Sequence, residues 1–102
     1  MDIITKDIIV NTLKEKYPYL ATHYGLKRIG LFGSYAKGMQ QKNSDIDLIA
    51  EFERPIGFKF IEFTEYLEKI LNHKVDVLTQ AGLQSIRLKK IAKNIKDTIV
   101  YV

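Results

Sequence analysis

One stretch decides the fold of this chain: Asp45-Ile46-Asp47-Leu48-Ile49-Ala50-Glu51-Phe52. Successive side chains of a β-strand point to opposite faces, so residues two apart share a face. Asp45 and Asp47 therefore lie on one face, with their Cα atoms about 6.5–7 Å apart. The other face is apolar and carries Ile46, Leu48, Ala50 and Phe52. We predict a strand with one covered face and one open face that bears two carboxylates.

Two more strands are expected around this one, Arg28–Phe32 (RIGLF) before it and Lys74–Thr79 (KVDVLT) after it. The first connection is short, which suits an antiparallel pair, and the second contains a full helix, which makes a parallel crossover the default. In the last strand Asp76 points away from the face shared by Val75, Val77 and Thr79. We therefore expect Asp76 to join Asp45 and Asp47 on the open face of the sheet.

The N-terminal segment has the periodicity of an amphipathic helix. Thr5 can cap its start and Gly25 can end it. Pro18 lies inside the periodic run, where a proline removes a hydrogen bond, so a kink or a restart is expected there.

The remaining segments predict further helices and an edge strand. They comprise a short helix over Ser34–Gly38, a helix marked by Phe60, Phe63, Leu67 and Ile70, a fourth helix marked by Leu88, Ile91 and Ile95, and an edge strand within Thr98–Val102. The alternation predicts an α/β (α+β) fold: a small mixed β-sheet with helices packed on one face.

The length and the composition of the chain limit the classes of protein to which it can belong. With 102 residues, 46% of them hydrophobic and 27% charged, the chain is expected to form a single globular domain over residues 1–102. It has no cysteine, which excludes a disulfide framework and a thiolate metal site. Neither a signal peptide nor an apolar run long enough to span a bilayer is visible, so we expect a cytoplasmic protein.

The net charge of +4 permits an anionic partner without selecting one. A basic cluster near the C-terminal helix offers a possible direct contact with nucleic acid or with an acidic protein: Arg87, Lys89, Lys93 and Lys96. A solvated helix face is the favoured interpretation of such a cluster.

Gly33-Ser34 supplies the second half of a possible catalytic site. The glycine lets a phosphate approach the backbone closely, and the serine hydroxyl can donate a hydrogen bond. In an antiparallel pair the end of the first strand lies beside the start of the second, which brings Gly33-Ser34 to Asp45 and Asp47. Each signal alone is ordinary, but together they predict a triphosphate site in which three acids hold two Mg²⁺ ions.

The motifs Gly33-Ser34-Tyr35-Ala36-Lys37-Gly38 and Ser44-Asp45-Ile46-Asp47-Leu48 resemble those of the DNA polymerase beta superfamily, and the short chain is similar to its minimal nucleotidyltransferase group. The resemblance implies that Gly33 and Ser34 grip the triphosphate of ATP. It implies that Asp45, Asp47 and Asp76 are catalytic acids and Mg²⁺ ligands, with Asp76 helping to activate the attacking hydroxyl. It also implies a phosphate contact for Lys37, where many relatives carry arginine.

Stand-alone members of this group resemble antitoxins encoded beside HEPN-domain toxins, which are ribonucleases. The resemblance therefore implies transfer of AMP from ATP to a tyrosine of a HEPN-type toxin. Two alternatives stay open: an antitoxin that masks its toxin by binding alone, and a nucleotidyltransferase that acts on RNA or on a small molecule.

Overall fold

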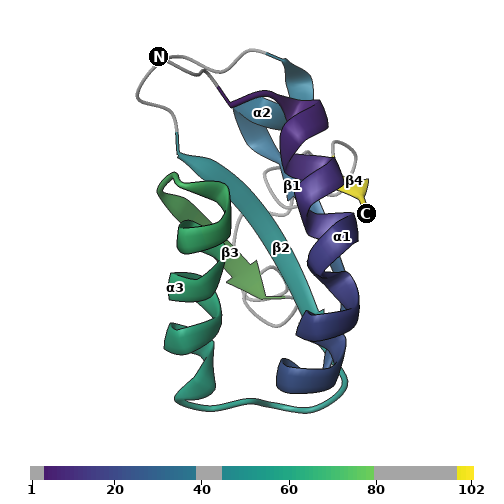
Figure 1. Ribbon diagram of the computed structural model, residues 1–102, viewed down its shortest axis with the longest axis vertical. Coiled ribbons are helices and arrows are strands. Elements are labelled where there is room, and N and C mark those ends of the chain that lie inside the picture. The colour runs from purple at the N-terminus through teal and green to yellow at the C-terminus, as the bar shows by residue number, and fades with distance from the viewer. Residues whose placement is uncertain (1–3, 39–44, 80–98) are drawn as a thin grey trace, which may run out of the picture.

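A computed structural model of the chain describes residues 4–38, 45–79 and 99–102 (Figure 1). Its elements follow in the order α1 (Lys6–Tyr24), β1 (Leu26–Phe32), α2 (Gly33–Lys37), β2 (Ile46–Phe52), α3 (Lys59–Leu71), β3 (Val75–Thr79) and β4 (Val100–Tyr101). The four strands form one mixed sheet in the order β3-β2-β1-β4. The predicted class and the predicted order of these elements are confirmed.

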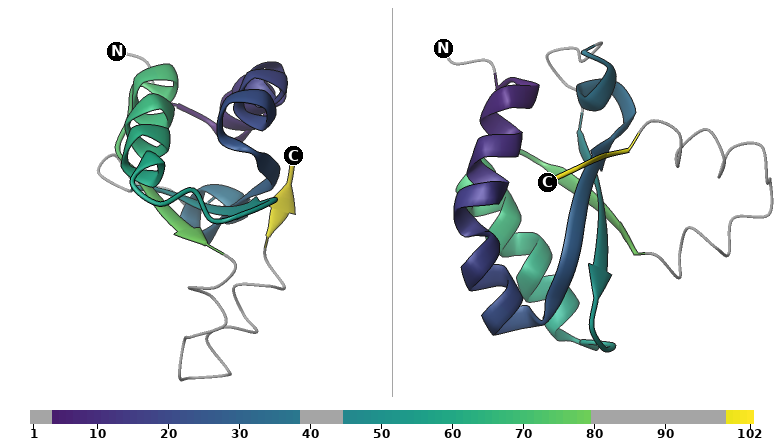
Figure 2. Two further views of the ribbon diagram at one scale, coloured as in Figure 1. Left: turned by 90° about the horizontal axis from the view of Figure 1, so that it is seen from below. Right: turned by 90° about the vertical axis from the view of Figure 1, so that its right-hand side faces the viewer.

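The molecule has two layers, with α1 and α3 on the same face of the sheet (Figure 2). The core lies between the layers, and the described residues contribute only apolar and tyrosine side chains to it. Among its fully buried members are Ile9, Leu13, Leu20, Ile29, Leu31, Ile46, Leu48, Ala50, Phe63 and Leu67. The alternation of DIDLIAEF is visible in this set, because Ile46 and Leu48 are buried while Asp47 between them is half-buried. The catalytic candidates thus contribute no side chain to the core.

Helix α1 has the predicted ends. Thr5 caps its start by accepting a hydrogen bond from the N–H of Ile8 at 3.3 Å. Gly25 ends it in the left-handed conformation, with φ of 72°. The predicted interruption at Pro18 is wrong as far as a restart is concerned, since a single helix runs through this residue. Apolar side chains on both sides of the proline pack into the same core, and this packing outweighs the loss of one backbone hydrogen bond.

Strand pairing follows the prediction. β1 and β2 are antiparallel, with Phe32 opposite Asp47. β2 and β3 are parallel, with Asp47 opposite Asp76. The tail adds an antiparallel edge strand to β1, although it is shorter than the predicted segment. These registers place the end of β1 and the starts of β2 and β3 at one end of the sheet.

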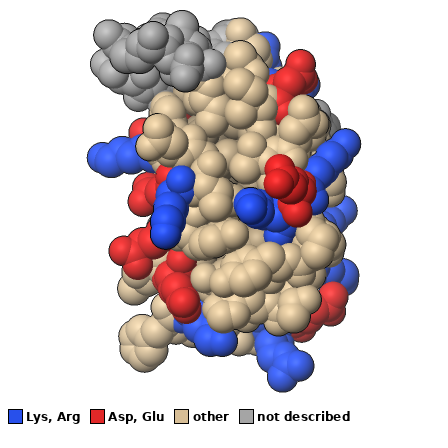
Figure 3. Space-filling model, viewed as in Figure 1, with Lys and Arg blue, Asp and Glu red and all other residues tan. Residues whose placement is uncertain are grey.

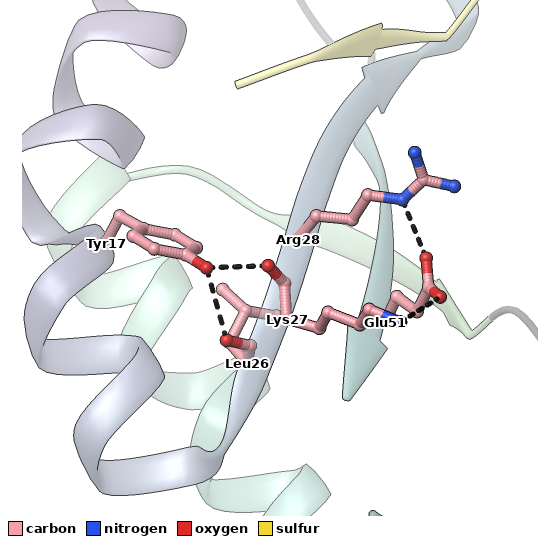
Figure 4. Close-up of polar contacts among 5 residues, drawn as sticks. All are labelled: Tyr17, Leu26, Lys27, Arg28 and Glu51. Carbon is pink, nitrogen blue, oxygen red and sulfur yellow. Dashed lines mark hydrogen bonds and ion pairs between the residues drawn. The ribbon is translucent and has the colours of Figure 1, made fainter. Parts of the chain in front are cut away.

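The opposite end of β1 is held by polar contacts (Figure 4). The hydroxyl of Tyr17 on α1 donates to the backbone oxygen of Lys27 at 2.6 Å. Arg28 pairs with Glu51 across β1 and β2, with 2.7 Å between Nε and Oε2, and this hydrogen bond lowers the pKa of Glu51. The position of Glu51 opposite Arg28 in the register gives this carboxylate its cationic partner.

Within the described ranges 4–38, 45–79 and 99–102, no helix has both the length and the apolar character that crossing a bilayer requires.

Candidate active site

Gly33 joins the end of β1 to α2 and lies directly against Asp47. Its φ of 74° is in the left-handed region, where a side chain is strained. A Cβ built on Gly33 would overlap the carboxylate of Asp47. Glycine is therefore required here for two independent reasons, and the second ties the Gly-Ser motif to the Asp-x-Asp motif.

The three predicted acids lie at this end of the sheet. Asp47 and Asp76 are opposite each other in the β2–β3 register, and Asp45 lies just before β2. Asp47 is half-buried, while Asp45 and Asp76 are exposed. Burial raises the pKa of Asp47 above its usual value, and the charges of Asp76 and Asp45 raise it further. The carboxylates therefore repel one another, and a divalent cation would relieve this repulsion.

Backbone contacts hold the strands that carry the acids. The N–H of Ile46, between Asp45 and Asp47, donates to the backbone oxygen of Lys74 at 3.0 Å. The N–H of Val75, next to Asp76, donates to Oε2 of Glu68 on α3 at 3.2 Å. The relative position of β2 and β3 is thus fixed close to the acids on both strands.

Helix α2 brings the other nucleotide-binding candidates. Ser34 is half-buried in its first turn, and Lys37 is exposed at its last residue. Tyr35, between them, is 2% exposed. Burial raises the pKa of the Tyr35 hydroxyl, and the charge of Asp45 adds to this. Helix α2 therefore lies within electrostatic range of the acids.

The arrangement suits Mg²⁺, although the side chains do not form a closed cage. In the part of the chain that the structure describes, no three His, Cys, Asp or Glu side chains already converge as a complete metal site. Mg²⁺ does not need one, because it is commonly held by one or two carboxylates together with waters and substrate phosphates. The paired Asp47 and Asp76, with Asp45 nearby, provide the hard oxygen ligands that this ion prefers.

The other surfaces of the described residues carry none of the predicted catalytic or nucleotide-binding residues. A cavity of about 560 Å³ lies at the far end of β2, and its lining includes Phe52, Pro55, Ile56 and Phe60 but none of the predicted site residues. On the face formed by α1 and α3, Lys and Arg are interspersed with Asp and Glu (Figure 3). The predicted basic cluster of Arg87, Lys89, Lys93 and Lys96 lies outside the described residues, as do Ser44 and the predicted fourth helix with Leu88, Ile91 and Ile95.

One residue beside the site was not predicted. His73 lies in the turn between α3 and β3, and its Nε2 is 3.2 Å from the hydroxyl of Tyr35. The sequence has no signal for this contact, because the two residues are far apart along the chain and a lone histidine in a turn is ordinary.

Comparison with known proteins identifies the family of this chain. Residues 6–102 match the nucleotidyltransferase domain family. The protein adenylyltransferase MntA of Thermococcus cleftensis is 37% identical over 103 residues, which covers all of both chains. The chain therefore belongs to the nucleotidyltransferase domain family.

Two solved structures share the fold. A protein provisionally assigned as a minimal nucleotidyltransferase aligns with a TM-score of 0.74 at 20% identity and covers 98% of each chain. A toxin–antitoxin crystal structure with AMP-PNP aligns with a TM-score of 0.62 at 24% identity, over 96% of this chain and 72% of that one.

The raised pKa of Asp47 predicts that this residue destabilises the metal-free protein. The folded state binds the Asp47 proton more tightly than the unfolded chain does, so stability falls as pH rises through the interval between the two pKa values. Asp47→Asn should therefore raise the melting temperature at neutral pH in the presence of a chelator. The gain should vanish as the pH approaches about 4, the ordinary carboxyl value.

Differential scanning calorimetry of both proteins, with and without Mg²⁺, measures this effect. Asp45→Asn is the matched control, because Asp45 is exposed and its substitution should give a smaller gain. A lower melting temperature for Asp47→Asn at neutral pH would contradict the electrostatic description of the site.

Proposed function

We propose that this nucleotidyltransferase transfers AMP from ATP to a hydroxyl group of a partner protein in a Mg²⁺-dependent reaction, and thereby acts as an antitoxin. The observation that carries the proposal is the meeting of Gly33 with Asp47, and of Asp47 with Asp76, at one end of the sheet. Hydrogen-bond donors for a triphosphate, side by side with carboxylate ligands for a metal ion, suit a site in which a Mg²⁺-bound nucleotide reacts.

Each residue has a role in this reaction. Gly33 leaves room for a phosphate close to the backbone, Ser34 donates its hydroxyl to a phosphate oxygen, and the exposed Lys37 supplies positive charge. Asp45, Asp47 and Asp76 would hold Mg²⁺, which stabilises the attacking and leaving oxygens of an in-line displacement.

We assign the acceptance of the proton to Asp76, because this exposed acid lies on the edge strand β3. The acceptor hydroxyl oxygen forms a bond to the α-phosphorus as Asp76 takes its proton. The bond from the α-phosphorus to the oxygen that bridges to the β-phosphate breaks, and pyrophosphate leaves with that electron pair.

The partner we propose is a HEPN-type toxin, modified on a tyrosine. Two comparisons support a protein acceptor: a full-length relative is a protein adenylyltransferase, and a structural neighbour is a toxin–antitoxin complex with an ATP analogue. The exposed position of Asp76 also suits an acceptor that approaches on the surface of another protein.

Removing the metal should abolish the reaction. With α-labelled ATP, Mg²⁺ and the toxin encoded beside its gene, label should appear on the toxin. Excess EDTA should reduce the transfer to background, because three carboxylates with no cation repel the triphosphate as well as one another. Restoring Mg²⁺ should restore the rate, and label transfer that persists without any divalent ion would contradict the proposed role of the acids.

The alternative function is masking of the toxin by binding alone. The toxin–antitoxin complex among the structural neighbours favours physical association as a contributing mechanism. The acids argue for catalysis in addition, since a surface used only for binding gains nothing from mutually repelling carboxylates.

A further inference from the structure

His73 connects all three segments that carry the proposed catalytic residues. Its Nδ1 lies 2.9 Å from the backbone oxygen of Lys74, and its Nε2 lies 3.2 Å from the hydroxyl of Tyr35. A carbonyl oxygen only accepts, so in the neutral ring Nδ1 carries the proton and donates to it. Nε2 is then the acceptor, and the Tyr35 hydroxyl is the donor.

The backbone oxygen of Lys74 also accepts the N–H of Ile46 at 3.0 Å. One carbonyl group with two lone pairs therefore receives a bond from the α3–β3 turn and another from β2. The resulting chain runs from Tyr35 on α2, through His73, to the Lys74 oxygen and on to Ile46 on β2. We call it the Tyr35–His73 link.

Every member of the link is close in sequence to a proposed site residue. Tyr35 follows Ser34, Ile46 separates Asp45 from Asp47, and Lys74 is two residues before Asp76. The contact between Tyr35 and His73 is the one described side-chain hydrogen bond that joins α2 to the turn preceding β3. The two rings also meet edge to face, with 5.7 Å between their centroids.

We infer that His73 and Tyr35 are positioning residues, which set the phosphate-binding helix α2 at the correct distance from the acids of β2 and β3. This inference rests on the proposed function, because it assigns the alignment of the triphosphate with the metal-binding acids to a specific hydrogen bond. Burial keeps the Tyr35 hydroxyl protonated at neutral pH, so it remains a donor throughout the working range. Neither side chain needs to touch the substrate.

Tyr35→Phe tests the inference, because it removes only the hydroxyl and keeps the buried ring. We expect kcat for AMP transfer to fall about tenfold, since misalignment of reacting groups lowers the rate of the chemical step. The KM for ATP should change less than about threefold, because the phosphate-binding groups themselves remain.

Tyr17→Phe is the matched control. Tyr17 also donates its hydroxyl to a backbone oxygen, that of Lys27 at 2.6 Å, but does so at the other end of β1 (Figure 4). Each variant loses one hydroxyl donor, so their melting temperatures should fall by similar amounts. Only Tyr35→Phe should lose kcat, and equal kcat values in the two variants would overturn the inference.

A second measurement is independent of activity. The chain has two histidines, so long-range ¹H–¹⁵N spectra at about pH 8, where an ordinary imidazole is neutral, resolve His73 against His23 as an internal reference. We expect His73 in the Nδ1–H form, with an Nε2 shift that moves in Tyr35→Phe and not in Tyr17→Phe. An unmoved shift would show that the hydrogen bond is absent and would overturn the link. Wild-type protein without transfer activity would instead contradict the proposed function.

Discussion

Replacing Asp45 and Asp47 together with asparagine is expected to lower the rate of AMP transfer by at least about 10³-fold, because it removes two of the carboxylates proposed to hold the Mg²⁺ that would stabilise the transition state. The fold should survive, since neither side chain belongs to the core and the uncharged variant has less internal repulsion. Transfer of label from ATP to the partner protein measures the rate, and calorimetry verifies the fold.

Glu51→Gln is the matched control for this double variant. Glu51 lies on the same strand and on the same face of it as Asp47. Its partner is the cationic Arg28, whereas Asp47 lies opposite another acid, Asp76. Its substitution should keep the transfer rate within about twofold, because it is remote from the reacting phosphate. Comparable losses in both proteins would mean that the charge of the face as a whole matters, and would contradict an assignment to Asp45 and Asp47.

The same double variant separates the two proposed mechanisms of antitoxin action. If the inactive variant still neutralises the toxin in cells as well as the wild type does, then masking by contact is sufficient and AMP transfer is dispensable. Loss of neutralisation with retained binding of the toxin is the result expected from a catalytic antitoxin.

Gly33→Ala should have the second largest effect. The substitution strains the backbone by about 1–2 kcal/mol at a left-handed φ, and the added methyl group overlaps the carboxylate of Asp47. Asp47 or α2 must move, so transfer should fall about 10²-fold, the loss expected when a catalytic group is misplaced by about 1 Å. The same labelled-ATP assay measures it.

Gly25→Ala isolates the conformational cost. Gly25 has nearly the same φ, 72° against 74° for Gly33, but a Cβ there meets nothing within 4 Å. Both variants should be less stable than the wild type, yet Gly25→Ala should retain full activity. If the two variants were equally active, the close approach of Gly33 to Asp47 would have no functional meaning.

Much of this architecture was predictable from local patterns. The alternation in DIDLIAEF predicted the face of Asp47, because an aspartate between buried isoleucine and leucine points away from the core. The alternation fails at Ile49, which is on the same face of the strand as Asp47 and is buried. The lengths of the connections then predicted an antiparallel β1–β2 pair and a parallel β2–β3 pair, and both pairings are observed. Helix α1 shows where such rules fail. The local chemistry of proline predicts a break at Pro18, but the helix continues through this residue because side chains on both sides of it pack into the core.

The convergence of the acids and Gly33 was predictable because it follows from the alternation of side chains along each strand and from the lengths of the connections. Their actual roles in catalysis remain predictions that the variants above test. His73 was not predictable, because its contact with Tyr35 depends on how a turn folds back against a helix distant in sequence. The partner of Glu51 was missed for a related reason: identifying it requires the exact β1–β2 register, including the irregularity near Leu26.

The pairing of Phe32 with Asp47 has a consequence for how this molecule matures. A one-residue shift in the register of β2 would turn Ile46 and Leu48 toward water and place the side chain of Asp47 in the apolar core. Enclosing a lone carboxylate in this way costs several kcal/mol, a large share of what a domain of this size has in reserve. A newly made chain is therefore expected to adopt the native register, because a folded protein with a shifted and inactive sheet would be too unstable to persist.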